Sequence, residues 1–260
     1  MIVVATVGTT HPLAFAGLTF AALALAADGI RPVCVVAGVT AQDASHVTAR
    51  VAVDAASIAA QFGALHDVPI GAFHVGALLS AESVVAVAGA LGAFPQTPVV
   101  LDPVFAVSGG EALGGEALGD AAARDALRTA LIPRATLVTP NLAEASALLG
   151  RDVNDVASMR EAASALVALG AGAALVKGGH LAGDPVDVFA DAHGTREWRS
   201  SRIGAGMRGT GDLLAAMAAA HLARGASLVE AIECARHHVR EAIARGVAFA
   251  GTRVASFPDD

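Results

Sequence analysis

The sequence of 260 residues has no tyrosine, one tryptophan, two cysteines and a single lysine. Two cysteines cannot build the framework of a disulfide-rich domain. Cys34 and Cys234 lie far apart among apolar neighbours, so we expect two buried, reduced thiols and a cytoplasmic protein. The start of the chain lacks the basic segment of a signal peptide.

The histidines show no zinc-motif spacing. His11 and His180 fall in loops, His74 lies in an apolar run, and His237 and His238 lie near the end.

Long apolar runs are also missing. The most apolar stretch, residues 13–27, is interrupted by Gly17 and Thr19, is shorter than a membrane span and is rich in alanine, which predicts a buried helix. The formal charge is −7 with scattered arginines, so the chain has neither a basic stripe for nucleic acid nor a polybasic membrane anchor. A negatively charged ligand must therefore be captured locally.

Short β-branched runs alternate with alanine-rich segments along the whole chain. Continuously apolar strands separated by helices indicate a parallel sheet that is covered on both faces. We therefore predict the α/β class, with a doubly wound, mostly parallel sheet and helices on both faces, in a single domain over residues 1–260. The expected parallel strands are residues 2–7, 33–39, 70–75, 99–101, 136–139 and 174–177. Residues 185–191 and 196–200 are predicted to form an edge hairpin, and helices over 211–224 and 228–245 to end the chain.

A glycine-rich turn runs directly into a strong helix-forming segment near residue 210. Gly209, Thr210 and Gly211 would expose free backbone N–H groups at the start of the helix, which is the arrangement of an anion site. Asp212 is a carboxylate beside that site, which points to chemistry that moves a proton rather than to simple anion binding. Alternatively, Thr210 or Asp212 only caps the helix.

Lys177 ends an apolar strand and is followed by two glycines. The other 16 basic residues are arginines, so a lysine here is unusual for this chain. Its compact ammonium on a flexible stem suits a phosphate that moves during a reaction. The alternative is an ordinary surface lysine in a turn.

Hard oxygen ligands follow two other strands. Asp102 precedes a proline that keeps it extended at the strand tip, and Asn141 and Glu144 lie three residues apart at the opening of a helix. Carboxylates of this kind suit Mg²⁺ shared with substrate phosphates. Alternatively, Asp102 is only a turn residue, and Asn141 and Glu144 only cap a helix.

Together these features predict phosphoryl transfer, with Lys177 and the helix start for phosphate charge, carboxylates for Mg²⁺ and Asp212 as acceptor of a hydroxyl proton. In open α/β sheets such groups meet at the carboxyl ends of the strands. The chain contains no P-loop, and the glycines after the first strand lack dinucleotide spacing.

Four motifs make the chain resemble the ribokinase-like small-molecule kinases, and within them the hydroxymethylpyrimidine/phosphomethylpyrimidine kinases of thiamine synthesis. They are LDPV at 101–104, TPNLAEA at 139–145, VKGGH at 176–180 and GTG at 209–211. The resemblance covers nearly the whole chain. It implies a cytoplasmic, homodimeric kinase that uses ATP and Mg²⁺ and phosphorylates the hydroxymethyl group of a small heteroaromatic alcohol.

The resemblance also implies roles for individual residues. Lys177 and Asp212 would be catalytic, and Gly209, Thr210 and Gly211 would form an anion hole. Asp102 and Glu144 would hold Mg²⁺. Nucleotide would contact Lys177, Asn141, Glu144 and Arg208, and substrate would contact Thr10 in the first loop, Gln42 and Gly76.

Four departures from the family pattern bear on the substrate. Asp212 stands where pyrimidine kinases usually have cysteine, and Arg208 where histidine is usual. The first loop, residues 8–17, lacks the usual aspartate and glycine pair, and residues 107–109 lack a common lysine. A pyridoxal or pyridoxine kinase is therefore the alternative, and a non-catalytic ligand-binding or regulatory homologue is a further one.

Overall fold

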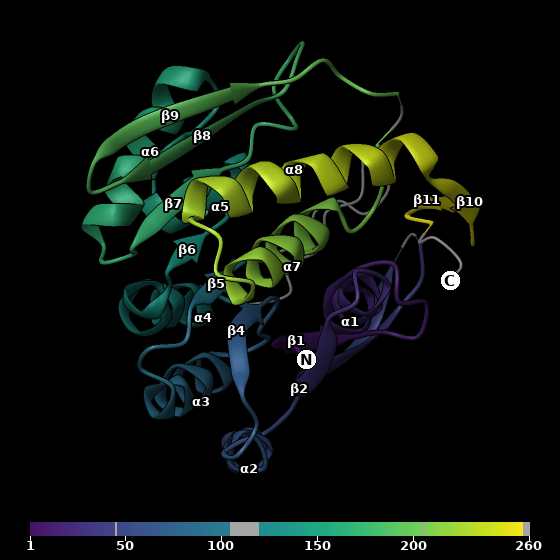
Figure 1. Cartoon of the computed structure of the whole chain (residues 1–260), viewed down its shortest axis with the longest axis vertical. Helices are drawn as coiled ribbons and strands as arrows, with labels where there is room; N and C mark the ends of the chain where they lie inside the picture. The colour runs from purple at the N-terminus through teal and green to yellow at the C-terminus, as the bar shows by residue number, and fades with distance from the viewer. Residues whose placement is uncertain (45, 105–119, 205, 257–260) are drawn as a thin grey trace.

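A nine-stranded sheet forms the centre of the molecule, in the order β3-β2-β1-β4-β5-β6-β7-β8-β9 (Figure 1). The computed structural model describes residues 1–44, 46–104, 120–204 and 206–256. Six neighbouring strands are parallel: β2 (Arg31–Gln42), β1 (Val3–Thr10), β4 (Ile70–Val75), β5 (Val99–Leu101), β6 (Leu137–Val138) and β7 (Ala173–Val176). The antiparallel strands β3 (Val47–Ala52), β8 (Val186–Asp191) and β9 (Gly194–Arg199) lie toward the edges. The predicted α/β class and the edge hairpin are confirmed.

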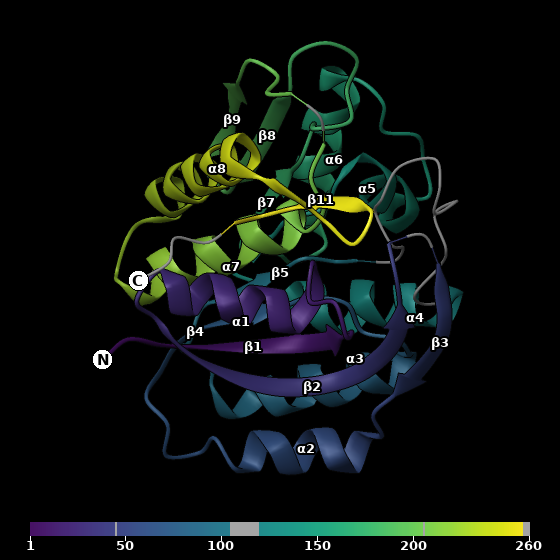
Figure 2. The ribbon, with the colours of Figure 1, turned by 90° about the vertical axis from the view of Figure 1, so that its right-hand side faces the viewer.

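Helices cover both faces of the sheet because successive strand residues point to opposite sides. In β1, Ala5 and Val7 belong to one buried apolar cluster and Val4 to the other. One face carries α1 (Gly17–Ala27) and α7 (Thr210–Ala223), with α8 (Leu228–Arg245) packed on α7 (Figure 2). The other face carries α2 (Ala55–Gly63), α3 (Ala81–Ala90), α4 (Ala121–Ala126), α5 (Leu142–Leu149) and α6 (Val156–Ala168), with short turns at Leu91–Ala93, Leu127–Leu131 and Ile132–Arg134.

The winding of the sheet reverses at β1. The chain passes from β1 to β2 on one side and then returns to place β4 on the other side of β1. In open α/β sheets the ligand crevice forms outside the carboxyl ends of the strands at this switch point. A ligand site is therefore expected at the carboxyl ends of β1 and β4.

Two strand predictions were incomplete. β2 continues to Gln42 and pairs with β3, so Thr40 and Gln42 lie in a strand and not in the loop after it. The extension contains the polar residues Thr40 and Gln42, so it does not stand out as part of an apolar strand. The chain also continues past α8 into a hairpin of β10 (Val247–Phe249) and β11 (Thr252–Val254), whereas two helices were expected to end it.

The helix predicted over residues 13–27 begins only at Gly17. Ala14 has a φ of +48° and Gly17 a φ of +71°, and neither value continues a right-handed helix. A Cβ at residue 17 would lie 2.6 Å from the carbonyl oxygen of Thr9, so glycine is needed where this loop returns to β1. Within the described residues, no helix combines the length and apolar character needed to cross a membrane.

The cysteines are free, as expected, but they are not buried. Cys34 is exposed and Cys234 is half-buried. Cys34 lies in the first half of β2, which β3 does not reach because their pairing begins at Gly38. The apolar sequence neighbours of Cys34 therefore gave a wrong prediction of its burial.

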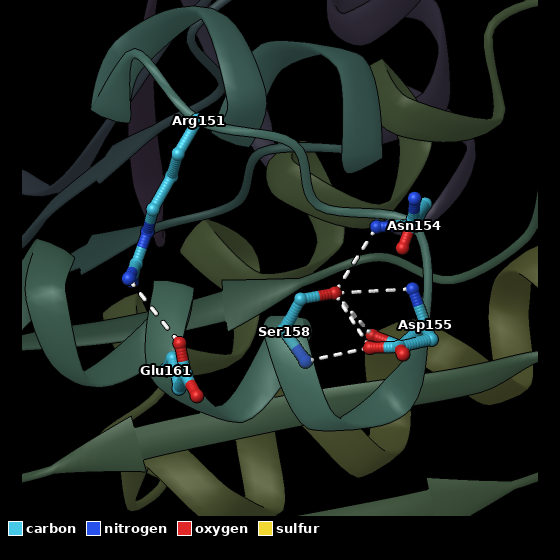
Figure 3. A network of polar contacts seen from close by, with 5 residues as sticks. All are labelled: Arg151, Asn154, Asp155, Ser158 and Glu161. Atoms are coloured by element: carbon cyan, nitrogen blue, oxygen red, sulfur yellow. Dashed lines mark hydrogen bonds and ion pairs between the residues drawn. The ribbon is translucent and has the colours of Figure 1, made fainter.

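The start of α6 shows how most helices of this chain begin (Figure 3). Asp155 accepts a hydrogen bond from the N–H of Ser158, whose hydroxyl lies 3.1 Å from the N–H of Asp155. Arg151 forms an ion pair with Glu161 one turn further along. Side-chain caps of this kind satisfy the N–H groups that the first turn leaves free.

Candidate active site

A cavity of about 240 Å³ opens at the carboxyl edge of the sheet, where the switch point predicts a ligand site. Residues from β1, β2 and from the segments after β4, β5, β6 and β7 line it, and α7 and α8 close it. Many residues that the sequence singled out are in its wall: Gln42, Asp102, Asn141, Glu144, Lys177, His180, Arg208, Gly209, Thr210, Gly211 and Asp212. The fold thus brings together residues from almost the whole length of the chain, from Thr9 to Ile243.

Lys177 and Asp102 form an ion pair at the base of this cavity. Lys177 Nζ donates to Asp102 Oδ1 at 2.7 Å, and the Thr139 hydroxyl donates to the same oxygen at 3.0 Å. The side chain of Asp102 is 2% exposed and that of Lys177 14% exposed. Burial opposes the charge of Lys177, but the carboxylates of Asp102 and Glu144 outweigh it and raise the pKa of the ammonium. Lys177 is therefore not a surface lysine.

The start of α7 faces the cavity without a side-chain cap. The residue before its first turn is Gly209, with a φ of +77°, and within the described part of the chain no side-chain cap is found at this position. The cap position is occupied by Gly209, so the alternative in which Thr210 or Asp212 only caps the helix is wrong. A Cβ at residue 209 would lie 2.5 Å from the carbonyl oxygen of Phe15. The first-turn N–H groups and the positive end of the helix dipole are thus available to an anion.

Gly211 brings this helix start close to the ion pair. A Cβ at residue 211 would lie 3.0 Å from Lys177 Nζ and 3.1 Å from Asp102 Oδ2. Contacts this short require a neighbour to move, so the approach depends on glycine. The ammonium and the N–H groups of α7 can therefore act on the same anion.

Asp212 lies in the first turn of α7, beside the same cluster. Burial, followed by the negative charge of Asp102, raises the pKa of its carboxyl group to about 6. A Cβ at Gly76 would lie 3.7 Å from Asp212 Oδ1, so Gly76 adjoins the carboxylate although it is not in the cavity wall. A carboxylate with this pKa is suited to accept a proton near neutral pH.

Asn141 and Glu144 cap α5 and also line the cavity. The side chain of Asn141 accepts from the N–H of Glu144 at 2.9 Å, and Glu144 Oε2 accepts from the N–H of Asn141 at 2.7 Å. This reciprocal pair is a capping box. Both residues therefore form the polar helix cap that was the alternative interpretation. The cap also orients the Glu144 carboxylate, which still lines the cavity.

The carboxylates are suited to a cation. Burial, opposed by the charge of Lys177 and helped by that of Asp102, raises the pKa of Glu144 to about 8. Asp102, Glu144 and Asp212 thus place three acidic groups around one ammonium. Oxygen donors in an excess of negative charge fit Mg²⁺ bound together with substrate phosphates.

One end of the cavity is lined by the first loop. Thr10 is not in the wall, because its hydroxyl pairs with that of Thr19. Thr9 and His11 line the cavity instead. His11 is 7% exposed, and neither ring nitrogen has a hydrogen-bond partner among the described residues. Burial, followed by the charge of Arg208, lowers the pKa of His11, so a neutral imidazole faces this end of the cavity.

Arg208 is held in the wall and does not point into solvent. It is 6% exposed, its Nη1 donates to the carbonyl of Ala44 at 3.0 Å, and its guanidinium lies 4.6 Å from the centre of the Phe15 ring. The Nε atom is buried without a partner among the residues described. Arg208 therefore presents fixed positive charge to the cavity.

Sequence reasoning missed the wall contributed by α8. Val239 and Ile243 line the cavity one helical turn apart, and Arg236 lies one turn before them. Arg236 Nε forms an ion pair with Asp187 at 2.8 Å, and Asp187 also accepts from the N–H of Gly178, next to Lys177. The spacing of three and four residues predicts a common helix face, but not the cavity that this face meets. Residues 107–109, where the family pattern has a lysine, lie outside the described residues.

A family model and curated relatives both match this chain over most of its length. The family model for phosphomethylpyrimidine kinase matches residues 16–255. The hydroxymethylpyrimidine/phosphomethylpyrimidine kinase of Streptomyces coelicolor is 36% identical and covers 86% of this chain and 81% of that protein. The thiamine biosynthesis bifunctional protein ThiED of Geobacter sulfurreducens is 41% identical over 80% of this chain, which spans 42% of that protein's length.

Solved structures share the fold over nearly the whole chain. The crystal structure of phosphomethylpyrimidine kinase from Clostridium difficile has a TM-score of 0.82 and 26% identity, covering 94% of this chain and 100% of that one. An ADP complex of Bacillus subtilis pyridoxal kinase has a TM-score of 0.88, also at 26% identity, covering 99% and 97%.

Proposed function

This chain belongs to the phosphomethylpyrimidine kinase family, and we propose that it phosphorylates the hydroxymethyl group of hydroxymethylpyrimidine, its monophosphate, or both, in thiamine biosynthesis or salvage. The observation that carries the proposal is the convergence of Asp212, Lys177 and the uncapped start of α7 in one cavity. ATP is the phosphoryl donor. These groups supply what phosphoryl transfer needs, namely a proton acceptor and positive charge for the transferred group.

In the proposed reaction the Asp212 carboxylate accepts the proton of the substrate hydroxyl. The hydroxyl oxygen then forms a bond to the γ-phosphorus of ATP, while the bond between that phosphorus and the β,γ-bridging oxygen breaks and ADP leaves. Lys177 and the N–H groups of Gly209, Thr210 and Gly211 at the start of α7 stabilise the negative charge on the phosphoryl group as it passes between the two oxygens. Atoms and charge balance without any further reactant.

Asp102 and Glu144 would hold Mg²⁺, with Asn141 fixing the position of Glu144 through the capping box. When bound, Mg²⁺ neutralises phosphate charge and helps to align the donor. Asp102 also anchors the Lys177 ammonium at 2.7 Å. The buried cluster thus fixes the positions of the catalytic groups before the substrates bind.

Different parts of the cavity wall would serve different ligands. Arg208 at the wall supplies charge for phosphate, and the apolar side chains of Val239 and Ile243 on α8 form a surface for the nucleotide base. Gln42 and the unpartnered His11 lie on the side of the first loop and would bind the heteroaromatic ring. Thr10 supports this loop through Thr19 and, on this proposal, does not touch substrate.

A pyridoxal or pyridoxine kinase is the second candidate. It is favoured by the likeness to the ADP complex of the Bacillus subtilis pyridoxal kinase and by the altered first loop, which puts His11 beside the substrate. Pyridoxal offers a hydroxymethyl group on a flat ring, as the pyrimidine does. A non-catalytic ligand-binding role is the third, and a carboxylate placed to accept a proton argues against it.

A substrate panel separates these candidates. ADP release is measured with ATP and Mg²⁺ on hydroxymethylpyrimidine, its monophosphate, pyridoxal, pyridoxine and pyridoxamine, with Asp212→Asn as the control. Turnover on the pyrimidines that disappears in the variant is expected. Turnover on the pyridines alone would transfer the assignment to the second candidate, and ATP binding without turnover on any compound would support a binding role.

We further propose that the protein is a cytoplasmic homodimer. The paired strands β2 and β3 place Val39 directly opposite Val51, and these side chains are 45% and 66% exposed. An exposed apolar pair on a sheet edge is a surface that a second copy can cover. Light scattering should give twice the mass of the chain, and a monomeric mass would refute the dimer.

A further inference from the structure

Three potential metal ligands meet where α1, α7 and α8 come together. Asp28 ends α1, His221 lies in the last turn of α7, and His238 lies in the middle of α8. One ligand atom from each lies within 4.8 Å of the other two. Figure 2 shows the three helices on one face of the sheet, with α7 packed between α1 and α8. None of these residues lines the catalytic cavity.

Asp28 is held so that one carboxylate oxygen faces the histidines. Arg224 Nη1 donates to Asp28 Oδ2 at 2.6 Å, and its Nη2 donates to the main-chain carbonyl of Asp28 at 2.7 Å. The second oxygen, Oδ1, lies 3.4 Å from His238 Nε2. In metal sites, the ligand atom that does not bind the metal usually forms a hydrogen bond, and this bond fixes the orientation of the ligand.

His238 is oriented in the same way. Its Nδ1 lies 2.9 Å from the carbonyl oxygen of Cys234, and because a carbonyl only accepts, Nδ1 carries the hydrogen. In the neutral ring this places the lone pair on Nε2, which faces Asp28. Two lone-pair donors that face each other need a proton or a cation between them.

His221 supplies a buried nitrogen. Its Nε2 is buried without a hydrogen-bond partner among the described residues, and the ring centre lies 5.5 Å from that of His238. An unpaired buried nitrogen is costly. A bound metal ion would supply the partner that this nitrogen lacks.

We propose that Asp28, His221 and His238 bind a divalent transition-metal ion of the Zn²⁺ type. Two ligand atoms about 2.1 Å from a tetrahedral Zn²⁺ are about 3.4 Å apart, which is the separation of Asp28 Oδ1 and His238 Nε2. His221 supplies the third ligand atom, which lies within 4.8 Å of the other two. Two histidines and one carboxylate are a usual Zn²⁺ ligand set, with a fourth position for water.

The site would join three helices at the end of the domain away from the reaction. α7 begins at the cavity and reaches His221 eleven residues later, about 16 Å along the helix at 1.5 Å per residue. Metal binding there would stabilise the packing of α1, α7 and α8 without supplying a reacting group. No zinc motif is visible in the sequence because the ligands come from three separate elements.

The test is calorimetric titration of chelator-treated full-length protein with ZnCl₂, together with thermal unfolding in the presence and absence of the metal. We expect one Zn²⁺ per chain and a higher Tm with Zn²⁺, because a ligand bound only by the folded state stabilises it. His238→Gln should weaken binding at least about tenfold. His237→Gln is the matched control, since His237 is the adjacent residue with a side chain that is 71% exposed, and it should bind as the wild type does.

Co²⁺ provides an independent readout, because a tetrahedral site gives intense visible absorption that an octahedral aqueous ion does not. Asp28→Asn, which keeps an acceptor for Arg224, serves as a second variant if His238→Gln fails to fold. The proposal is overturned if wild-type protein binds no Zn²⁺, or if His238→Gln or Asp28→Asn binds Zn²⁺ as tightly as His237→Gln.

Discussion

Lys177 Nζ donates to Asp102 Oδ1 at 2.7 Å, across 75 residues of sequence, and this contact holds two charges at the base of the cavity. In the proposed mechanism the two charges have different tasks, since Lys177 would bind phosphate and Asp102 would bind the cation. Because both are largely buried, each also depends on the other for its own stability.

The ion pair should contribute to both stability and turnover. Lys177→Ala leaves Asp102 as an unpaired buried carboxylate, so the free energy of unfolding should fall by about 3–5 kcal/mol. Lys177→Ala combined with Asp102→Asn should recover part of this loss, because the isolated charge is removed. Urea unfolding of the single and double variants measures the effect. Arg151→Ala, which breaks an exposed pair with Glu161, should cost less than about 1 kcal/mol.

The same Lys177→Ala variant should lower kcat by about 10²–10³-fold, the usual effect of removing one group that stabilises charge in a transition state. The KM for ATP should change much less, because the interaction strengthens as the phosphoryl group is transferred. Steady-state kinetics at saturating Mg²⁺ measures both. An unchanged kcat would contradict the role of Lys177.

Asp212→Asn should bind ATP nearly as the wild type does and should lower kcat by about 10²–10⁴-fold, since the amide cannot accept the hydroxyl proton. The side chains have the same shape, so the fold should be retained. Nucleotide binding by calorimetry and turnover by ADP release separate the two effects. Near-normal turnover would remove Asp212 from the mechanism.

The rate should fall at acid pH because of Asp212. Its pKa is raised to about 6, and only the ionised carboxylate accepts a proton, so kcat/KM should decrease as the pH falls through about 6 and approach its plateau above it. The residual activity of Asp212→Asn should lack this acid limb. The same acid limb in both proteins would assign the titration to another group.

Gly211→Ala should reduce activity through geometry. The added Cβ would lie 3.0 Å from Lys177 Nζ and 3.1 Å from Asp102 Oδ2, so the ion pair or α7 must shift. A misplacement of about 1 Å can cost about 10²-fold in rate, so a shift of a few tenths of an ångström should lower kcat by less than this. Gly63→Ala, at the end of α2 with nothing within 4 Å of the new Cβ, is the matched control and should keep wild-type kcat. Equal kinetics of the two variants would show that the close approach at Gly211 is unnecessary.

The sequence predicted the parallel sheet well, because continuously apolar strands such as β1 and β4 carry their own signal. It also located Lys177, Asp102 and the start of α7, since parallel strands end at one edge and glycines mark the close approaches. These inferences need only local patterns and the general geometry of the α/β class.

The remaining features depend on contacts between distant elements. Thr10 and His11 are adjacent in sequence, but the partner of Thr10 at Thr19 turns its hydroxyl away, and His11 lines the cavity. The wall formed by Val239 and Ile243 requires the packing of α8 over α7. The exposure of Cys34 depends on where β3 stops. None of these can be read from neighbouring residues.

The most direct test of the proposed mechanism is to follow the products by phosphorus NMR when the protein is mixed with ATP, Mg²⁺ and hydroxymethylpyrimidine or its monophosphate. The account predicts ADP together with a new phosphate ester on the hydroxymethyl oxygen of the former, or a diphosphate from the latter, formed by wild-type protein and almost undetectable with Asp212→Asn. Inorganic phosphate without a phosphorylated pyrimidine, or equal product formation by the variant, would contradict it.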